Sequence, residues 1–116
     1  MRGEFVCSYA SRDPERAAEY QRRHGGVRHY AGYDEALQDP EVDAVVIAVP
    51  PCFHLKLALR ALESGKHVLV EKPAFPQLDD YRTAIEAREQ AGRVVLIGEN
   101  DHYKPLAVAL RRLLDC

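Results

Sequence analysis

Residues 43–49 of the chain are DAVVIAV, an almost unbroken run of β-branched and small apolar residues. A strand that is buried on both faces of a parallel sheet has this composition, because neither of its faces meets water. Pro50 and Pro51 follow directly and end the run. The segment therefore predicts a buried strand in the middle of an α/β sheet.

The segments on either side alternate between the strand and the helix period. Strands are predicted at 4–10, 28–30, 67–70 and 94–98, and helices at 14–24, 33–37, about 53–64, 77–91 and 105–114. Asp13-Pro14 supplies an N-cap and a first-turn proline, and Gly25, Gly65 and Gly92 follow three of the helices. This order predicts right-handed crossovers and a mostly parallel sheet with helices on both faces.

The composition is that of one globular domain and excludes several other classes. The 116 residues are 47% hydrophobic and 29% charged, with a net charge of −2, so no basic face for nucleic acid is indicated. No apolar stretch approaches the roughly 20 residues of a membrane span. Three cysteines, Cys7, Cys52 and Cys116, form no CxxC pair, so neither a disulfide framework nor a metal site is predicted. Cys7 is expected to act as a small hydrophobic residue in a strand. Because no apolar run of signal-peptide length occurs at the N-terminus, the cytoplasm is the expected location of the protein.

Polar and rigid residues cluster after the predicted strands. In open parallel sheets, ligands bind beyond the carboxyl ends of the strands. The residues at those ends are Ser11-Arg12, Pro50-Pro51 with His54, Glu71-Lys72-Pro73, and residues 99–103, which include Asn100. No core requirement explains this distribution, so a binding site is expected at this edge of the sheet.

Two segments carry a family resemblance. Residues 39–73, DPEVDAVVIAVPPCFHLKLALRALESGKHVLVEKP, resemble the Gfo/Idh/MocA oxidoreductases, and GKHVLVEKP at 65–73 is the most specific part. Residues 6–20, VCSYASRDPERAAEY, are similar to the second strand and following helix of that family. The resemblance implies a Rossmann-like α/β domain that binds NADP or NAD, in an oxidoreductase acting on a CH–OH group of a sugar, polyol or related substrate.

The resemblance also implies residue roles. Lys72 matches the lysine that lies near the nicotinamide and the reacting hydroxyl, where an ammonium can hydrogen-bond an oxygen that gains negative charge. Glu71 would orient Lys72 or bind the cofactor ribose, and Pro73 would fix the turn, with a cis Lys72–Pro73 bond as often found in the family. Lys72 is therefore the predicted catalytic residue.

The remaining predicted cofactor contacts lie at three other strand ends. Ser11 and Arg12 occupy the position that contacts the adenosine ribose, and an arginine there favours NADP because it can pair with the 2′-phosphate. Val49, Pro50 and Pro51 stand in place of the family's Thr-Pro-Asn, so the polar residues that flank the proline in the family are absent here. His54 matches a histidine near the cofactor, or is a helix N-terminal histidine with local bonds, and Asn100 follows the family's sixth strand.

The sequence contains no GxGxxG, the turn that holds pyrophosphate at a helix N-terminus. We therefore expect residues 1–116 to be a partial NAD(P)-binding Rossmann domain that lacks the first βα unit and is inactive as an isolated chain. The alternatives are one subunit of a split dehydrogenase and a non-catalytic nucleotide-binding or receiver-like signalling module. The expected partner is a second copy of the chain in a homo-oligomer or a complementing subunit. A receiver needs acidic residues where this chain has Ala10-Ser11 and Val49-Pro50.

Overall fold

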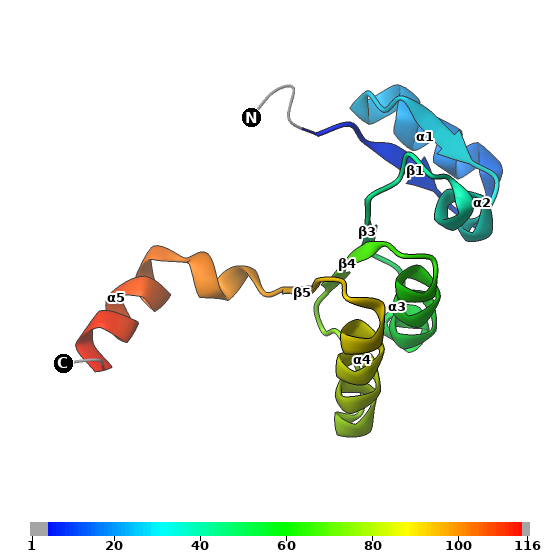
Figure 1. Cartoon of the computed structure of the whole chain (residues 1–116). Helices are drawn as coiled ribbons and strands as arrows, with labels where there is room; N and C mark the ends of the chain where they lie inside the picture. The colour runs from blue at the N-terminus through cyan, green and yellow to red at the C-terminus, as the bar shows by residue number, and fades with distance from the viewer. Residues whose placement is uncertain (1–4, 115–116) are drawn as a thin grey trace. The chain divides into compact units, whose positions relative to one another are not determined.

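The computed structural model describes residues 5–114, which form two compact units (Figure 1). Unit 1 is Met1–Asp43 and unit 2 is Ala44–Cys116. Every strand pairing in the described residues is parallel, and helices connect the strands. The predicted Rossmann-like α/β class is therefore confirmed. Within this range, no helix is long and apolar enough to cross a membrane.

Unit 1 is a βαβα segment, and its first helix is capped at both ends. Its elements are β1 (Ser8–Ala10), α1 (Pro14–His24), β2 (Arg28–Tyr30) and α2 (Tyr33–Gln38). The Asp13 side chain accepts a hydrogen bond from the Glu15 backbone N–H at 3.0 Å, and Gly25 ends α1 with φ at 74°. A non-glycine residue would be strained at that φ, so the predicted cap and stop signals are both confirmed.

The end of α2 is tied to β2 through one carboxylate. Asp39 accepts hydrogen bonds from the Glu41 backbone N–H at 2.8 Å, the Tyr30 hydroxyl at 2.7 Å and Arg28 Nη1 at 2.6 Å. The Glu41 N–H, followed by the Tyr30 hydroxyl and Arg28, lowers the pKa of Asp39 below its ordinary value. Burial, followed by the bond to Asp39, raises the pKa of Tyr30.

Acid is expected to destabilise unit 1 through Asp39. The folded-state pKa of Asp39 lies below its unfolded value, so its contribution is complete above the unfolded pKa and is lost as the pH falls through the folded one. Thermal melts at pH 7 and pH 3 should show a smaller acid loss for Asp39→Asn than for the wild type. Asp79→Asn removes an exposed i,i+3 pair with Arg82 and is the matched control. Equal acid losses in all three proteins would contradict this role for Asp39.

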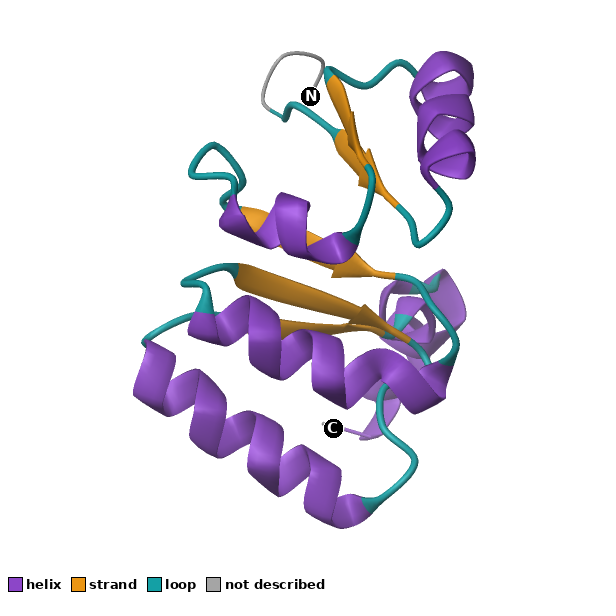
Figure 2. Ribbon diagram, turned by 90° about the vertical axis from the view of Figure 1, so that its right-hand side faces the viewer, coloured by secondary structure: helices purple, strands orange, loops and turns teal. Residues whose placement is uncertain are grey.

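Unit 2 contains a three-stranded parallel sheet in the order β3-β4-β5, with helices packed along it (Figure 2). Its elements are β3 (Ala44–Ile47), α3 (His54–Glu63), β4 (His67–Glu71), α4 (Leu78–Ala91), β5 (Val95–Gly98) and α5 (Pro105–Leu114), with 3₁₀ turns at Pro51–Phe53 and Asn100–Tyr103. Ile47, Val70 and Ile97 align across the three strands. The predicted strand segments 43–49, 67–70 and 94–98 thus contain adjacent parallel strands, in agreement with the predicted parallel sheet.

One face of this sheet forms the core of unit 2. Val68 and Val70 of the central strand are 3% and 0% exposed, and Ile47 of β3 is buried beside them. Ala58, Ala61 and Leu62 of α3 are also buried. These side chains alternate with outward-facing ones along each strand, as the strand period requires.

The other face of the sheet corrects the prediction of burial on both sides. Val46 is 68% exposed and Leu96 is 57% exposed, and both align with Leu69 of β4 on that face. A β-branched run thus indicates a strand with two apolar faces. It does not show whether a helix within the described residues covers each face.

The prediction that Cys7 is a small hydrophobe within a strand is wrong, and two helices also expose apolar side chains. Leu78 and Ile85 of α4 are exposed, and the buried residue of that helix is Ala84. Leu106, Leu110 and Leu113 of α5 are also exposed. Cys7 is exposed and precedes β1, which begins only at Ser8, while Cys116 lies outside the described residues. Apolar spacing thus located α4 and α5, although several of the apolar side chains of these two helices are exposed.

Candidate functional site

The carboxyl ends of β3, β4 and β5 lie next to one another because the strands are parallel and in register. Glu71, the last residue of β4, aligns with Gly98, the last residue of β5. Ile47 of β3 aligns with Val70, so Val49 and Pro50 leave the sheet beside Glu71-Lys72. Unit 2 therefore brings three predicted site segments together at the carboxyl ends of its strands. Lys72 directly follows the central strand, β4.

Lys72 lies between two carboxylates. Its Nζ is 3.7 Å from Glu99 Oε1 and 3.8 Å from Asp101 Oδ2, and its side chain is 42% exposed. Asp101 also forms an ion pair with Lys104 Nζ. The hydrogen bond from Lys104 to Asp101, with smaller electrostatic contributions from Lys104 and Lys72, holds the pKa of Asp101 below its ordinary value. The ammonium of Lys72 is thus fixed by charge at the sheet edge while remaining accessible to a ligand.

Glu71 and Gly98 fit closely together. A Cβ at position 98 would lie 3.2 Å from Glu71 Oε1, so glycine leaves room for the Glu71 carboxylate. Glu71 Oε2 also accepts a weak hydrogen bond from the Lys72 backbone N–H at 3.3 Å. The Lys72–Pro73 bond is cis, as predicted. Glu71 thus packs over the neighbouring strand and contacts the turn that carries Lys72.

His54 is buried at the start of α3, with 1% of its surface exposed. Its Nδ1 is 2.8 Å from the carbonyl oxygen of Ala74, and its Nε2 is 2.7 Å from that of Val49. One partner is local and the other is 20 residues away. Both ring nitrogens therefore contact backbone carbonyls, which leaves neither of them directed at a ligand.

The other predicted residues differ in their surroundings. Asn100 is exposed in the 3₁₀ turn after β5. Ser11 and Arg12 follow β1 in unit 1, where Ser11 Oγ accepts a hydrogen bond from the Asp13 backbone N–H at 3.2 Å and Arg12 is exposed. Unit 2 alone therefore brings together Val49, Pro50, His54, Glu71, Lys72, Pro73 and Asn100.

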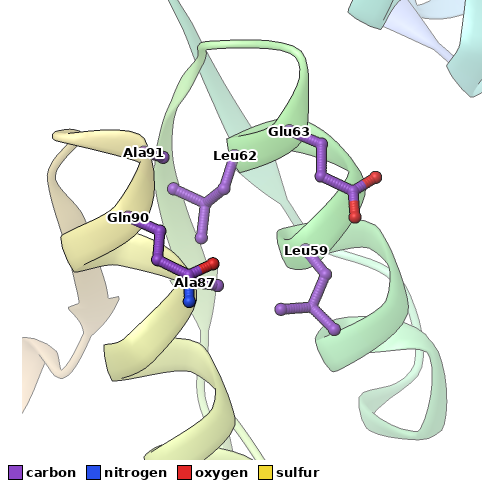
Figure 3. Close-up of a pocket in the computed structure, with 6 residues that line it drawn as sticks. All are labelled: Leu59, Leu62, Glu63, Ala87, Gln90 and Ala91. Carbon is purple, nitrogen blue, oxygen red and sulfur yellow. The ribbon is translucent and has the colours of Figure 1, made fainter.

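A hollow of about 310 Å³ lies elsewhere in unit 2 (Figure 3). Its walls come from the C-terminal halves of α3 and α4, and they are Leu59, Leu62, Glu63, Ala87, Gln90 and Ala91. None of these residues belongs to the predicted site. In the part of the chain that the structure describes, no group of three or more His, Cys, Asp or Glu side chains could hold a metal.

Comparison with known proteins identifies the family. The sequence profile of the Gfo/Idh/MocA oxidoreductases, a family with an NAD-binding Rossmann fold, matches residues 2–99. The chain belongs to this family. Membership excludes the receiver-like alternative and makes the chain part of an NAD(P)-binding Rossmann domain.

Individual family members match over most of the chain. An uncharacterized oxidoreductase of Rhizobium meliloti is 44% identical over 88 residues, which are 76% of this chain and 26% of that protein. The 1,5-anhydro-D-fructose reductase of Ensifer adhaerens is 36% identical over 113 residues, 97% of this chain and 33% of the reductase. The chain therefore spans a third or less of these two relatives.

A solved structure of the family supports the same conclusion. The 3-ketoreductase KijD10 of Actinomadura kijaniata, in complex with NADP and TDP-benzene, superposes with a TM-score of 0.87 at 30% identity. The match covers 95% of this chain and 34% of KijD10. The described fold is thus that of a family member whose structure contains NADP.

Sequence reasoning missed two features of the site. Glu99 and Asp101 flank Lys72, although only Asn100 between them was predicted as a site residue. Their position directly after a predicted strand was the available signal. The contact of His54 with Ala74 had no signal in the local sequence, because it depends on how the loop after Pro73 folds back.

Proposed function

We propose that the chain is the NADP-binding portion of an oxidoreductase that acts on a CH–OH group of a sugar, polyol or related substrate. The observation that carries the proposal is the position of Lys72 at the exit of the central strand, between the exits of β3 and β5. The matches to a sugar-derivative reductase and to an NADP complex support it. Residues 1–116 would then form part of the dinucleotide-binding domain.

Lys72 has the chemistry of a proton donor and acceptor for the substrate oxygen. The neutral amine form of a lysine beside a hydroxyl can accept its proton, and the ammonium form can donate a hydrogen bond to an oxygen that becomes negative. Glu99 and Asp101 hold the ammonium at the sheet edge, and its 42% exposure leaves it accessible to a substrate. A bound nicotinamide would take up the hydride when the CH–OH group is oxidised, and Lys72 would take up the hydroxyl proton; in the reverse direction Lys72 would donate the proton.

The residues at the strand exits fit one part of a dinucleotide. Asn100 carries an amide that can donate to and accept from the cofactor, and Pro50 and Pro73 present rigid apolar surfaces. Glu71, packed against Gly98, offers carboxylate oxygens to a ribose hydroxyl. The pyrophosphate lacks its usual partner because the sequence has no GxGxxG. We therefore propose weak cofactor binding and no turnover by the chain alone.

A complementing polypeptide, or a second copy of the chain, is the partner that we propose for a working enzyme. Among the described residues, β1 pairs only with β2, and β3 pairs only with β4 on one side. An unpaired strand edge is a template for a further strand. Exposed free thiols at Cys7 and Cys52 suit the reducing cytoplasm, where we place the protein.

Arg12 is expected to determine the preference for NADP. A guanidinium that pairs with the 2′-phosphate contributes about 1.5–3 kcal/mol, so Arg12→Ala should weaken NADP binding about 10- to 100-fold. NAD lacks that phosphate, so its affinity should not change. Calorimetric titrations of both nucleotides into the wild type, Arg12→Ala and the control Arg23→Ala, near the end of α1, measure this. Unchanged NADP affinity in Arg12→Ala would refute the assignment, and a wild type that binds neither nucleotide would refute the proposed function.

A further inference from the structure

His54 connects two loops that carry the candidate site. Its ring contacts the carbonyl oxygen of Val49, at the exit of β3, and that of Ala74, two residues after Lys72. Ala74 and Phe75 are themselves 2% and 7% exposed, so the loop after Pro73 is anchored in the interior at this point. By contrast, Lys72 and Pro73 are exposed, and the buried anchor lies directly after them.

The ring geometry determines what His54 can do. Carbonyl oxygens only accept hydrogen bonds, so a ring nitrogen must carry a proton to bond either of them. At 1% exposure, water cannot replace a lost partner, and an unbonded buried polar atom is costly. The two contacts therefore make His54 a connection between β3, the first turn of α3 and the loop that carries Lys72.

We propose that His54 is a positioning residue: its Nδ1–H donates to the Ala74 carbonyl and holds the Lys72–Pro73 turn against the exit of β3. The assignment differs from a direct cofactor contact, because the ring nitrogens face backbone carbonyls. The expected effect of His54 on cofactor binding rests on the proposed function, whereas its expected effect on the order of the loop after Pro73 does not.

Two substitutions separate the two bonds of His54. The amide nitrogen of asparagine is two bonds from Cβ, as is Nδ1, and that of glutamine is three bonds away, as is Nε2. His54→Asn thus keeps a donor at the position that faces Ala74, whereas His54→Gln removes that donor and places one toward Val49. His67→Gln is the matched control, because His67 Nδ1 accepts a bond from the Val94 backbone N–H at the start of β4.

Hydrogen exchange of the whole chain, measured without cofactor, tests the inference. The amides of Ala74 and Phe75 should exchange about tenfold faster in His54→Gln and at the wild-type rate in His54→Asn and His67→Gln. Equal exchange in the two His54 variants would overturn the proposal. If a variant does not fold, a long-range ¹H–¹⁵N spectrum of the wild type decides: a proton on Nδ1 of His54 supports the proposal, and its absence overturns it.

Titration of NADP into the same variants separates this inference from the proposed function. Affinity should fall about tenfold in His54→Gln and be restored in His54→Asn. If loop exchange behaves as expected but the wild type binds no NADP, the positioning of the loop stands and the proposed function fails. If NADP binds and the two His54 variants exchange alike, the proposed function stands and the role of His54 fails.

Discussion

The purified 116-residue chain is expected to oxidise no sugar or polyol with NADP above the blank rate. Turnover requires cofactor and substrate to be held in reacting geometry, and such positioning is equivalent to effective concentrations of about 10⁵–10⁸ M. Lys72 can exchange a proton, but the chain has no glycine-rich pyrophosphate turn and spans 33% of the anhydrofructose reductase that it resembles. A well-placed lysine alone cannot hold cofactor and substrate in that geometry.

The assay follows NADPH absorbance with a panel of aldoses, ketoses and polyols in both directions. The full-length 1,5-anhydro-D-fructose reductase, at the same concentration, is the positive control for the conditions. Steady turnover by the isolated chain, abolished by Lys72→Met and retained by the control Lys56→Met, would contradict the expected inactivity. It would also show that the described residues form a complete active site.

Val70→Asp is expected to unfold unit 2. Val70 is 0% exposed in the central strand, with Ile47 and Ile97 as its aligned neighbours. A carboxylate there would have no charged partner among these neighbours, and burying such a group typically costs more than about 4 kcal/mol. That loss is comparable to the whole stability of a small domain. Circular dichroism and urea titration of the variant should show loss of the cooperative transition.

Val46→Asp makes the same chemical change on the other face of the sheet. Val46 is 68% exposed, so the new carboxylate remains hydrated, and the loss should stay within about 1 kcal/mol, the range of strand propensities. The difference between the two variants measures how one-sided the core is. Equal and large losses would mean that the face carrying Val46 and Leu96 is covered in solution.

Local sequence patterns predicted the elements well because each signal acts within a few residues. Asp13-Pro14 and Gly25 define α1 because the cap bond and the left-handed φ involve only neighbouring backbone atoms. The β-branched run at 43–49 predicted β3 for the same reason. The position of Lys72 and Asn100 at one end of the sheet could be predicted because parallel strands bring their carboxyl ends together.

The features of the site and the core that the sequence did not predict depend on contacts between distant segments. The bond from His54 to Ala74 joins residues 20 positions apart, and nothing in the spacing of either segment indicates it. The ion pairs of Lys72 with Glu99 and Asp101 require the register of β4 against β5. The exposure of Val46 and Leu78 depends on which elements are present to cover them, which periodicity does not report.

The most direct test of the account is a map of NADP binding on the ¹⁵N-labelled chain. Amide shifts should move on titration at Val49, Glu71, Lys72 and residues 99–101, which lie at the carboxyl ends of β3, β4 and β5, and at 11–12 in unit 1. The opposite edge of the sheet, residues 64–67 and 92–94, should remain unchanged. Shifts confined to that opposite edge, or none at millimolar NADP, would contradict a cofactor site around Lys72.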